Sequence, residues 1–421
     1  MQSKLSFWLI HFLFVASCSL FFQTTNTIAQ ETQIFVNDAE LFSQAQEHYD
    51  MGNYALAQQK FVSFLQSTAF NEKRDAHTKR MTAHFYEAMC AYKLGHPNVE
   101  TLFVDFIANY EDGGYFRNMA NYYLGQMYFA KRKYRDAIAA FKQVDTDYLS
   151  EAEYAEFYFE MAYSHFTSKK FSQAKKMFAK IINTYNQYYF DANYYYGILS
   201  FFDKDYDQAL SSFQRIEKNK RYDKYMPYYI TLIYYYQSQY DDLLAYAAPK
   251  AKVSGLKNQK EINHIVGQTL FNRKQFQEAL PYLEFYVEKS RKVRKEDVFQ
   301  LGFTQYQIGR YNDAIKNFTQ LNTLTDSIGQ NAMYHLADSY LKTNQKQEAR
   351  NAFDIASRLD ADKTITEVAT FSYAKLSYEL GYHSQAISTL RNFITDYPNS
   401  NYNTEARFLL SNIFETTQNY K

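Results

Sequence analysis

The sequence is poor in residues that interrupt helices and in residues that cross-link a chain. Its 421 residues include five prolines, twelve glycines and two cysteines. Proline and glycine end or weaken helices, so their scarcity favours a chain that is helical throughout. Cys18 lies in an N-terminal segment that we expect to be removed, which leaves Cys90 alone. An intrachain disulfide is therefore excluded, and Cys90 is interpreted as a small buried residue.

Signatures of strands and of catalysis are also missing. No long alternation of apolar and polar residues is bounded by turn residues. The sequence contains no Gly-x-Gly-x-x-Gly, phosphate-loop or Gly-x-Ser-x-Gly motif. His84 and Glu87 have the spacing of one helical face, but no second pair of ligands accompanies them. We expect no enzyme activity, catalytic residue, cofactor, metal ion or small-molecule substrate.

The charge is balanced. Lys and Arg number 46 against 45 Asp and Glu, a formal net charge of +1. This balance argues against a nucleic-acid partner. The strongest basic run, from Lys289 to Lys295, follows a predicted helix end, where a solvated loop is the simpler interpretation. A surface for an anionic lipid or partner is the alternative.

What the sequence does contain is a repeat with a period of 34 to 37 residues. Seven copies have a small residue at the same position, which we call the small slot, and one copy has Leu243 there. The small residues are Ala137, Ala174, Ala209, Ala279, Ala314, Ala349 and Ala386. Self-similarity at this period is typical of a solenoid in which stacked units bury their apolar faces against each other.

Each copy has further ordered positions. An aromatic residue usually stands three places before the small slot, as Tyr311 does before Ala314, and a large apolar residue stands four places after it, as Phe318 does. This spacing predicts two helices joined by a short polar turn. Small residues twelve places before the slot should let the two helices approach closely. The glycines among them are Gly125, Gly197, Gly267 and Gly302.

The period and the order of small, aromatic and apolar residues resemble the tetratricopeptide repeat. The resemblance is clearest in "YYLGQMYFAKRKYRDAIAAF" from Tyr122 and "QLGFTQYQIGRYNDAIKNF" from Gln300. It implies an all-α, right-handed superhelical solenoid of antiparallel helix pairs. Residues 38–421 would form about ten repeats and an incomplete last one. Because the last half-repeat lacks its second helix, we expect the sequence to be the N-terminal part of a longer protein.

Residues 1–29 have the pattern of a secretory signal peptide. An apolar run from Leu5 to Phe22 is followed by Thr27-Ile28-Ala29, which predicts cleavage after Ala29. The alternative is a lipoprotein signal with Cys18 as the lipidated residue, although Leu20-Phe21-Phe22 extends the apolar run past it. Resemblance to exported bacterial repeat proteins implies the periplasm or the outer-membrane periphery of a Gram-negative bacterium.

The partner-binding groove is predicted from the densest aromatic patch. Two adjacent copies place six aromatic residues in the first predicted helix of each pair, namely Tyr194, Phe201, Phe202, Tyr228, Tyr235 and Tyr236. The resemblance implies that such residues face a concave groove and bind a peptide, and packing between repeats is the competing interpretation. One subgroup of the family clamps a carboxyl-terminal peptide with lysines and asparagines. The first clamp position in each repeat is aromatic or histidine here, so we do not expect that function.

The sequence therefore predicts a protein–protein interaction scaffold of the bacterial cell envelope. Its partners would be other proteins or peptides of the envelope, bound in the solenoid groove by preorganised contacts. Two alternatives remain. One is a lipidated assembly factor anchored at the outer membrane through Cys18. The other is the targeting arm of a longer enzyme.

Overall fold

The structure is a computed structural model that describes residues 38–67 and 74–417. Within these residues there are 21 α-helices, one short 3-10 helix and no strand. The fold class is therefore all-α, a solenoid of antiparallel helix pairs. The signal-peptide prediction for residues 1–29 and Cys18 lies outside the described residues. The chain divides into two units, residues 1–120 and 121–421, with the boundary inside α5.

The first unit holds two complete helix pairs and the beginning of a third. Its helices are α1 (Asp38–Asp50), α2 (Tyr54–Gln66), α3 (Arg74–Leu94), α4 (Val99–Asn109) and the start of α5 (Gly114–Ala130). Cys90 lies fully buried in α3, and burial raises the pKa of its thiol to about 12. This thiol is therefore a small core residue and not a reactive one.

The second unit continues the series of pairs, and a single helix follows the last of them. Its elements after α5 are α6 (Tyr134–Phe141), η1 (Thr146–Tyr148), α7 (Glu151–Thr167), α8 (Phe171–Phe178), α9 (Tyr189–Phe202), α10 (Tyr206–Ile216), α11 (Met226–Tyr236), α12 (Tyr240–Ala251), α13 (Gln259–Asn272), α14 (Phe276–Lys289), α15 (Lys295–Gln307), α16 (Tyr311–Thr319), α17 (Ser327–Lys342), α18 (Lys346–Arg358), α19 (Lys363–Glu379), α20 (His383–Asp396) and α21 (Asn403–Thr417).

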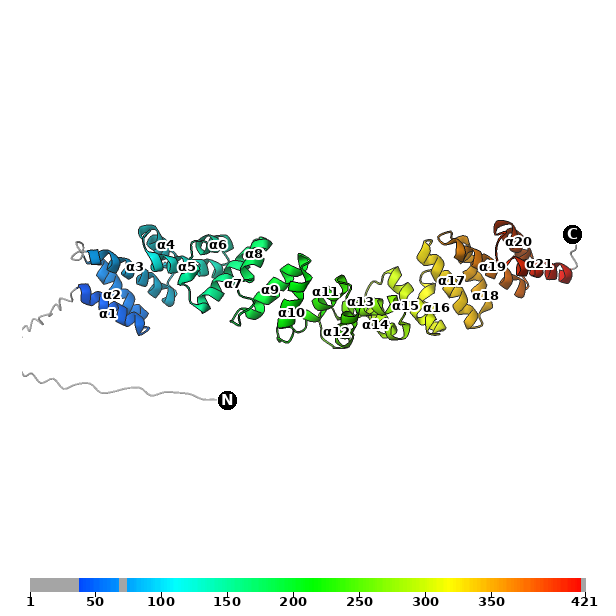
Figure 1. Ribbon diagram of the computed structural model, residues 1–421, viewed down its shortest axis with the longest axis horizontal. Helices are drawn as coiled ribbons and strands as arrows, with labels where there is room; N and C mark the ends of the chain where they lie inside the picture. The colour runs from blue at the N-terminus through cyan, green and yellow to red at the C-terminus, as the bar shows by residue number, and fades with distance from the viewer. Residues whose placement is uncertain (1–37, 68–73, 418–421) are drawn as a thin grey trace, which may run out of the picture. The chain divides into compact units, whose positions relative to one another are not determined.

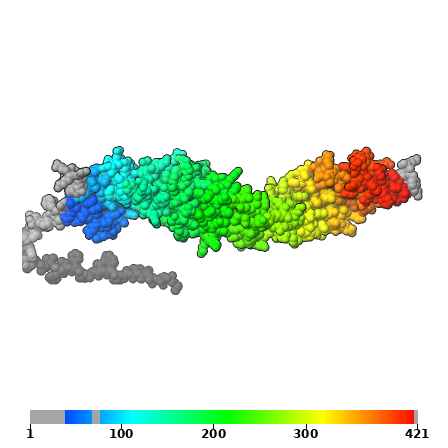
Figure 2. Space-filling model, viewed as in Figure 1, coloured from blue at the N-terminus to red at the C-terminus, as the bar shows by residue number. Residues whose placement is uncertain are grey.

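Each helix of the second unit packs mainly on its neighbours in sequence. The pairs follow one another in a row in Figure 1, with α9 and α10 between the pair α7–α8 and the pair α11–α12. The space-filling view shows the same order as successive colour bands from green to red (Figure 2). The buried side chains of the described part of this unit form separate local clusters, so its stability is a sum of local interfaces.

The turn inside each pair has one backbone geometry throughout the second unit. A residue with φ between 57° and 80° occupies the same slot in eight successive turns: Arg132, Lys169, Lys204, Ser238, Lys274, Gly309, Asn344 and Gly381. The left-handed residue lets its own N–H and the next N–H bond back to the helix end, as Lys169 N donates to Phe166 O at 3.0 Å and Lys170 N donates to His165 O at 2.9 Å. These turns place the two helices of each pair against each other.

The two helices of a pair are buried to different degrees. The first helix lies between its partner and the next pair, so α7 and α13 expose only their ends. The second helix buries one stripe and exposes the rest, as α8 buries Ala174 and Phe178. All seven alanines of the repeating slot are fully buried. The four glycines twelve places earlier lie against the large apolar residue of the second helix, with Gly267 against Leu283 and the others against phenylalanines.

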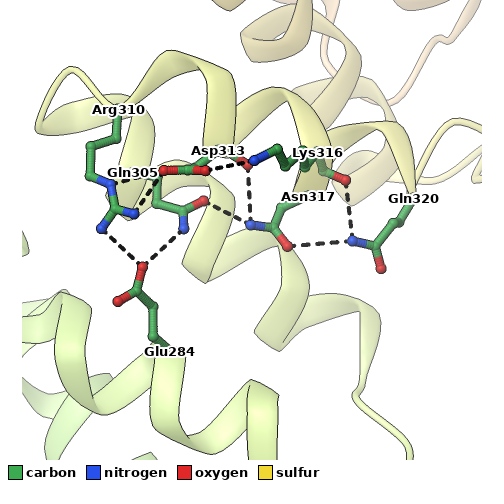
Figure 3. A network of polar contacts seen from close by, with 7 residues as sticks. All are labelled: Glu284, Gln305, Arg310, Asp313, Lys316, Asn317 and Gln320. Atoms are coloured by element: carbon green, nitrogen blue, oxygen red, sulfur yellow. Dashed lines mark hydrogen bonds and ion pairs between the residues drawn. The ribbon is translucent and has the colours of Figure 1, made fainter.

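Polar side chains tie neighbouring pairs together on the outside. Around the turn between α15 and α16, Arg310 Nη1 donates to Glu284 Oε1 in α14 at 3.0 Å, and Arg310 Nη2 donates to Asp313 Oδ2 at 2.7 Å (Figure 3). Asn317 Nδ2 in α16 donates to Gln305 Oε1 in α15 at 2.7 Å. Contacts of this kind connect α14 with the following pair and neutralise the charges of the turn.

Candidate partner-binding surface

The six aromatic residues predicted to line the groove do not share one environment. Tyr194 and Phe201 of α9 pack against the core of α10 and α11, where Tyr194 stacks on Tyr222 at 4.9 Å between ring centroids. Tyr228 and Tyr235 of α11 pack against the core that α12, α13 and α14 form. These four half-buried rings join adjacent helix pairs, which is the packing role that competes with the groove interpretation.

The other two rings lie at the surface. Phe202, the last residue of α9, is 73% exposed, and Tyr236, the last residue of α11, is 54% exposed. We call Phe202 and Tyr236 the exposed ring pair. Both stand at the same position of their repeats, Phe202 seven places before Ala209 and Tyr236 seven places before Leu243. Exposed aromatic rings at matching positions of adjacent repeats form an amphipathic surface of the kind found at the centres of interfaces.

The position of the exposed ring pair is aromatic only in these two repeats. In the other repeats of the second unit it holds a small, polar or charged residue: Ala130, Thr167, Asn272, Gln307, Lys342 and Glu379. Helix packing does not require an aromatic residue here, since six repeats form the same pair without one. The aromatic choice at Phe202 and Tyr236 therefore concerns the surface and not the fold.

Neighbouring rings hold the exposed ring pair in place. Tyr236 stacks on Tyr206 of α10 at 5.7 Å with 15° between the ring planes. Phe202 meets Phe201 edge-on at 5.7 Å. Gln237 Nε2, next to Tyr236, donates to Asp207 Oδ1 at 2.8 Å. Rings that are already fixed lose less conformational freedom when a partner binds, which favours binding.

The charges around the exposed ring pair are mostly neutralised. Lys175 Nζ lies 3.0 Å from Asp203 Oδ2 and 3.3 Å from Asp205 Oδ2. Burial opposes the charge of Lys175, but the two carboxylates outweigh it and raise its pKa. Arg273 Nη1 lies 2.6 Å from Asp241 Oδ1 and lowers the pKa of that carboxyl. The rings therefore provide the apolar part of this surface, and the ion pairs connect neighbouring repeats beside it.

Three of the five cations in the run from Lys289 to Lys295 form ion pairs. Lys289 Nζ lies 2.8 Å from Glu288, and Lys295 forms an ion pair with Asp326. Arg294 Nε donates to Asp297 Oδ2 at 2.8 Å, and His264 Nε2 lies 2.7 Å from Asp297 Oδ1. Although burial opposes ionisation, hydrogen bonds from His264 and Arg294 hold the pKa of Asp297 well below its usual range. The paired residues of the run connect helix pairs, and Arg291 and Lys292 are exposed in the loop without an ion pair among the described residues.

His84, one of the two residues considered for a metal site, contacts a tyrosine. His84 Nδ1 lies 2.6 Å from the Tyr110 hydroxyl, and burial, with the charge of Arg80, lowers the pKa of His84. Within residues 38–67 and 74–417, no group of three His, Cys, Asp or Glu side chains is placed to hold a metal ion. Among the same residues, no helix is both long and apolar enough to cross a membrane.

A buried acid without an ion pair in the described part of the chain lies in α7. Glu160 of α7 is buried, and its Oε2 has no hydrogen-bond partner among the described residues. Burial, with the charge of Glu156, raises the pKa of Glu160 to about 8. Glu156 itself accepts hydrogen bonds from the hydroxyls of Tyr122 at 3.0 Å and Tyr188 at 3.1 Å. The sequence carried no signal for the burial of Glu160, because Glu156 stands one turn before it on the same face of α7.

Together these features define a helical-repeat scaffold, a class of fold that presents extended surfaces to other proteins. A family model described as the tetratricopeptide repeat matches residues 331–357 and 369–400. These two stretches coincide with the pairs α17–α18 and α19–α20. The match supports the tetratricopeptide interpretation of the repeat. A comparison with curated proteins finds no match.

Several solved structures are similar to parts of the chain. One is a complex of Naa15/Naa10 bound to HypK-THB, 12% identical with a TM-score of 0.40, covering 88% of this chain and 65% of that one. Another is a tetratricopeptide repeat protein from Parabacteroides merdae, 11% identical with a TM-score of 0.34, covering 62% and 99%. A third is YrrB, described as a TPR protein with an unusual peptide-binding site, 18% identical with a TM-score of 0.24, covering 50% and 89%. At these scores none of the likenesses supports an argument about function.

Proposed function

We propose that this protein is a binding scaffold of the bacterial cell envelope that docks a partner protein on the exposed ring pair. The observation that carries the proposal is that Phe202 and Tyr236 are exposed at one repeat position that is aromatic nowhere else in the second unit. Aromatic anchors of this kind supply much of the energy of protein–protein binding. The solenoid supplies a rigid frame, so little ordering is needed on the scaffold side.

The envelope location is proposed from residues 1–29. Their apolar run and the Thr27-Ile28-Ala29 ending direct the chain to export, to the periplasm or the periphery of the outer membrane. In this proposal the ligand is an extended or helical protein segment. In this proposal the scaffold binds and positions this segment, and any reaction on the segment is carried out by other proteins.

Site-specific photo-crosslinking tests the proposal. A benzophenone amino acid placed at Phe202 in the full chain should capture a discrete partner in cells that export the protein. Phe408 of α21, which is 62% exposed, is the matched control position and should not capture that partner. Equal capture at both positions, or capture only at Phe408, would show that the exposed ring pair is not the docking surface.

A further inference from the structure

A pocket of about 540 Å³ lies beside the turns of the pairs α5–α6 and α7–α8. Four cationic side chains line it: Arg132, Lys133 and Arg135 from one turn and Lys170 from the next. Asp136 is the single carboxylate in the lining. The pocket therefore carries a local excess of positive charge in a chain whose overall charge is balanced.

Most of this charge is not neutralised. The side chains of Arg132, Arg135 and Lys170 form no ion pair within the part of the chain that the structure describes. Arg310 provides a direct comparison, because it occupies the same repeat slot as Lys170 four places before the buried alanine. Arg310 has two carboxylates within 3.0 Å, from Glu284 and Asp313 (Figure 3). Arg310 thus has its own counter-ions, whereas the equivalent Lys170 at this pocket has none among the described residues.

The positive potential extends into the helix behind the pocket. His165 of α7 is buried, three residues before the lining residue Ser168. Burial lowers the pKa of His165, and the positive charges of Lys170 and Lys142 lower it further. An anion bound in the pocket would relieve this repulsion.

The surface next to the pocket is aromatic, and the turn that follows carries balanced charge. Phe171, directly after Lys170, is 48% exposed, and the next pair presents Phe202 at its turn. The same turn carries Asp203 and Asp205. Lys204 of this turn and the paired Lys175 balance these two carboxylates, so the excess of positive charge does not continue beyond the pocket. A long polyanion such as nucleic acid or an anionic membrane would meet no further excess of cations there. A protein segment with acidic residues at one end and apolar residues at the other would match both the pocket and the aromatic surface beside it.

We propose that this cationic pocket binds an acidic segment of the partner protein. Carboxylates of the segment would be held by Arg132, Arg135 and Lys170, and its apolar residues would lie on Phe171 and Phe202. Arginine is suited to this role, because its planar guanidinium can hold a carboxylate through two parallel hydrogen bonds. The inference rests on the proposed function and adds the chemistry of the ligand to it.

Binding of synthetic peptides to the full chain tests this assignment. The probe is a fluorescent peptide with a cluster of Asp and Glu residues followed by phenylalanines. Its reference is the same peptide with Asn and Gln in place of the acids. We expect the acidic peptide to bind at least tenfold more tightly, with an advantage that shrinks as salt screens the charges. Equal affinity for the two peptides would overturn the proposal.

Charge reversal locates the site. The variant Arg135→Glu/Lys170→Glu should weaken binding of the acidic peptide at least tenfold. The control Arg291→Glu/Lys292→Glu makes the same change of net charge in the exposed loop between α14 and α15 and should change the affinity less than twofold. If both double variants lose binding equally, the effect comes from net charge and the pocket is not the site.

Two further measurements separate the other outcomes. Vesicles containing phosphatidylglycerol should bind the wild type and the Arg135→Glu/Lys170→Glu variant equally, and a selective loss of vesicle binding without a loss of peptide binding would assign the pocket to lipid instead. Crosslinking at Phe202 reports on the proposed function independently. If Phe202 captures its partner equally well in the charge-reversed variant, the scaffold function stands and the acidic-segment inference is wrong.

Discussion

Gly197 of α9 lies directly against the ring of Phe213 in α10. A Cβ atom on Gly197 would stand 2.5 Å from Cε1 of Phe213, closer than real side chains approach. The equivalent pair, Gly302 and Phe318, is looser, since a Cβ there would be 3.0 Å from the ring. The two glycines therefore offer a matched test of how closely the helices of a pair are packed.

We predict that Gly197→Ala destabilises the protein more than Gly302→Ala. Both substitutions gain the same helix propensity, but the first must displace a ring, at a cost of roughly 1–3 kcal/mol. Hydrogen exchange should show the loss of protection first in α9 and α10, because repeats transmit stability through their neighbours. Equal exchange and equal melting temperatures for the two variants would contradict this packing.

The buried Glu160 predicts a pH-dependent stability. In the folded chain its carboxyl stays protonated up to about pH 8, whereas the unfolded chain releases the proton near the ordinary pKa of 4.5. Between these pH values the folded state binds more protons, so stability falls as pH rises, by at most about 1.4 kcal/mol per pH unit. Glu160→Gln removes the ionisable group, and we expect it to stabilise the protein at pH 8.5 and not at pH 4.

Denaturation curves at these two pH values check the Glu160 prediction. Glu348→Gln in α18 is the control, because Glu348 is exposed and its replacement should leave the pH profile unchanged. If the wild type and Glu160→Gln lose stability in parallel as pH rises, the buried carboxyl is not the group responsible.

The aromatic residues of α9 and α11 should separate into two classes on mutation. Tyr228→Ala/Tyr235→Ala removes rings that pack on the core of the next pairs, and we expect a loss of roughly 2 kcal/mol or more. Phe202→Ala/Tyr236→Ala removes exposed rings and should cost less than about 1 kcal/mol. Thermal melts of both double variants measure the two losses of stability. A larger loss for Phe202→Ala/Tyr236→Ala would mean that these rings, and not Tyr228 and Tyr235, form part of the core.

Processing at the N-terminus is predicted from the sequence alone. Cleavage after Ala29 should give an exported chain beginning at Gln30, because a short apolar run ends there in small residues. Intact-mass spectrometry of envelope fractions measures the new terminus. A chain that begins at an acylated Cys18 would instead support the lipidated assembly factor.

The sequence predicted the helix pairs well, because the repeating positions are the ones that pack between helices. Each small residue at the slot, such as Ala314, marks a buried crossing, and the aromatic and apolar residues at fixed offsets mark the two faces around it. Because many copies share the period, a copy with an unusual residue at one position can still be recognised. Leu243, for example, occupies its slot fully buried although it is large.

The surface was harder to predict, because neighbouring residues of one helix face different ways. Tyr235 and Tyr236 are adjacent in the sequence, yet the first packs on the next pair and the second is exposed. The charge of a basic run in the sequence also does not show which of its cations are paired in the fold. Lys295 is neutralised by Asp326, 31 residues away in the following pair. Arg135 and Lys170 do not belong to a basic run, because they lie in separate repeats. The fold brings them together in one pocket.

The most direct test of the scaffold account is the affinity of the crosslinked partner for two purified proteins, the wild type and Phe202→Ala/Tyr236→Ala. Titration calorimetry or fluorescence anisotropy measures the dissociation constant, and a thermal melt of the same samples reports folding. The account predicts at least a tenfold loss of affinity with a melting temperature close to that of the wild type. Unchanged affinity in a folded variant would contradict it and place the binding surface elsewhere on the solenoid.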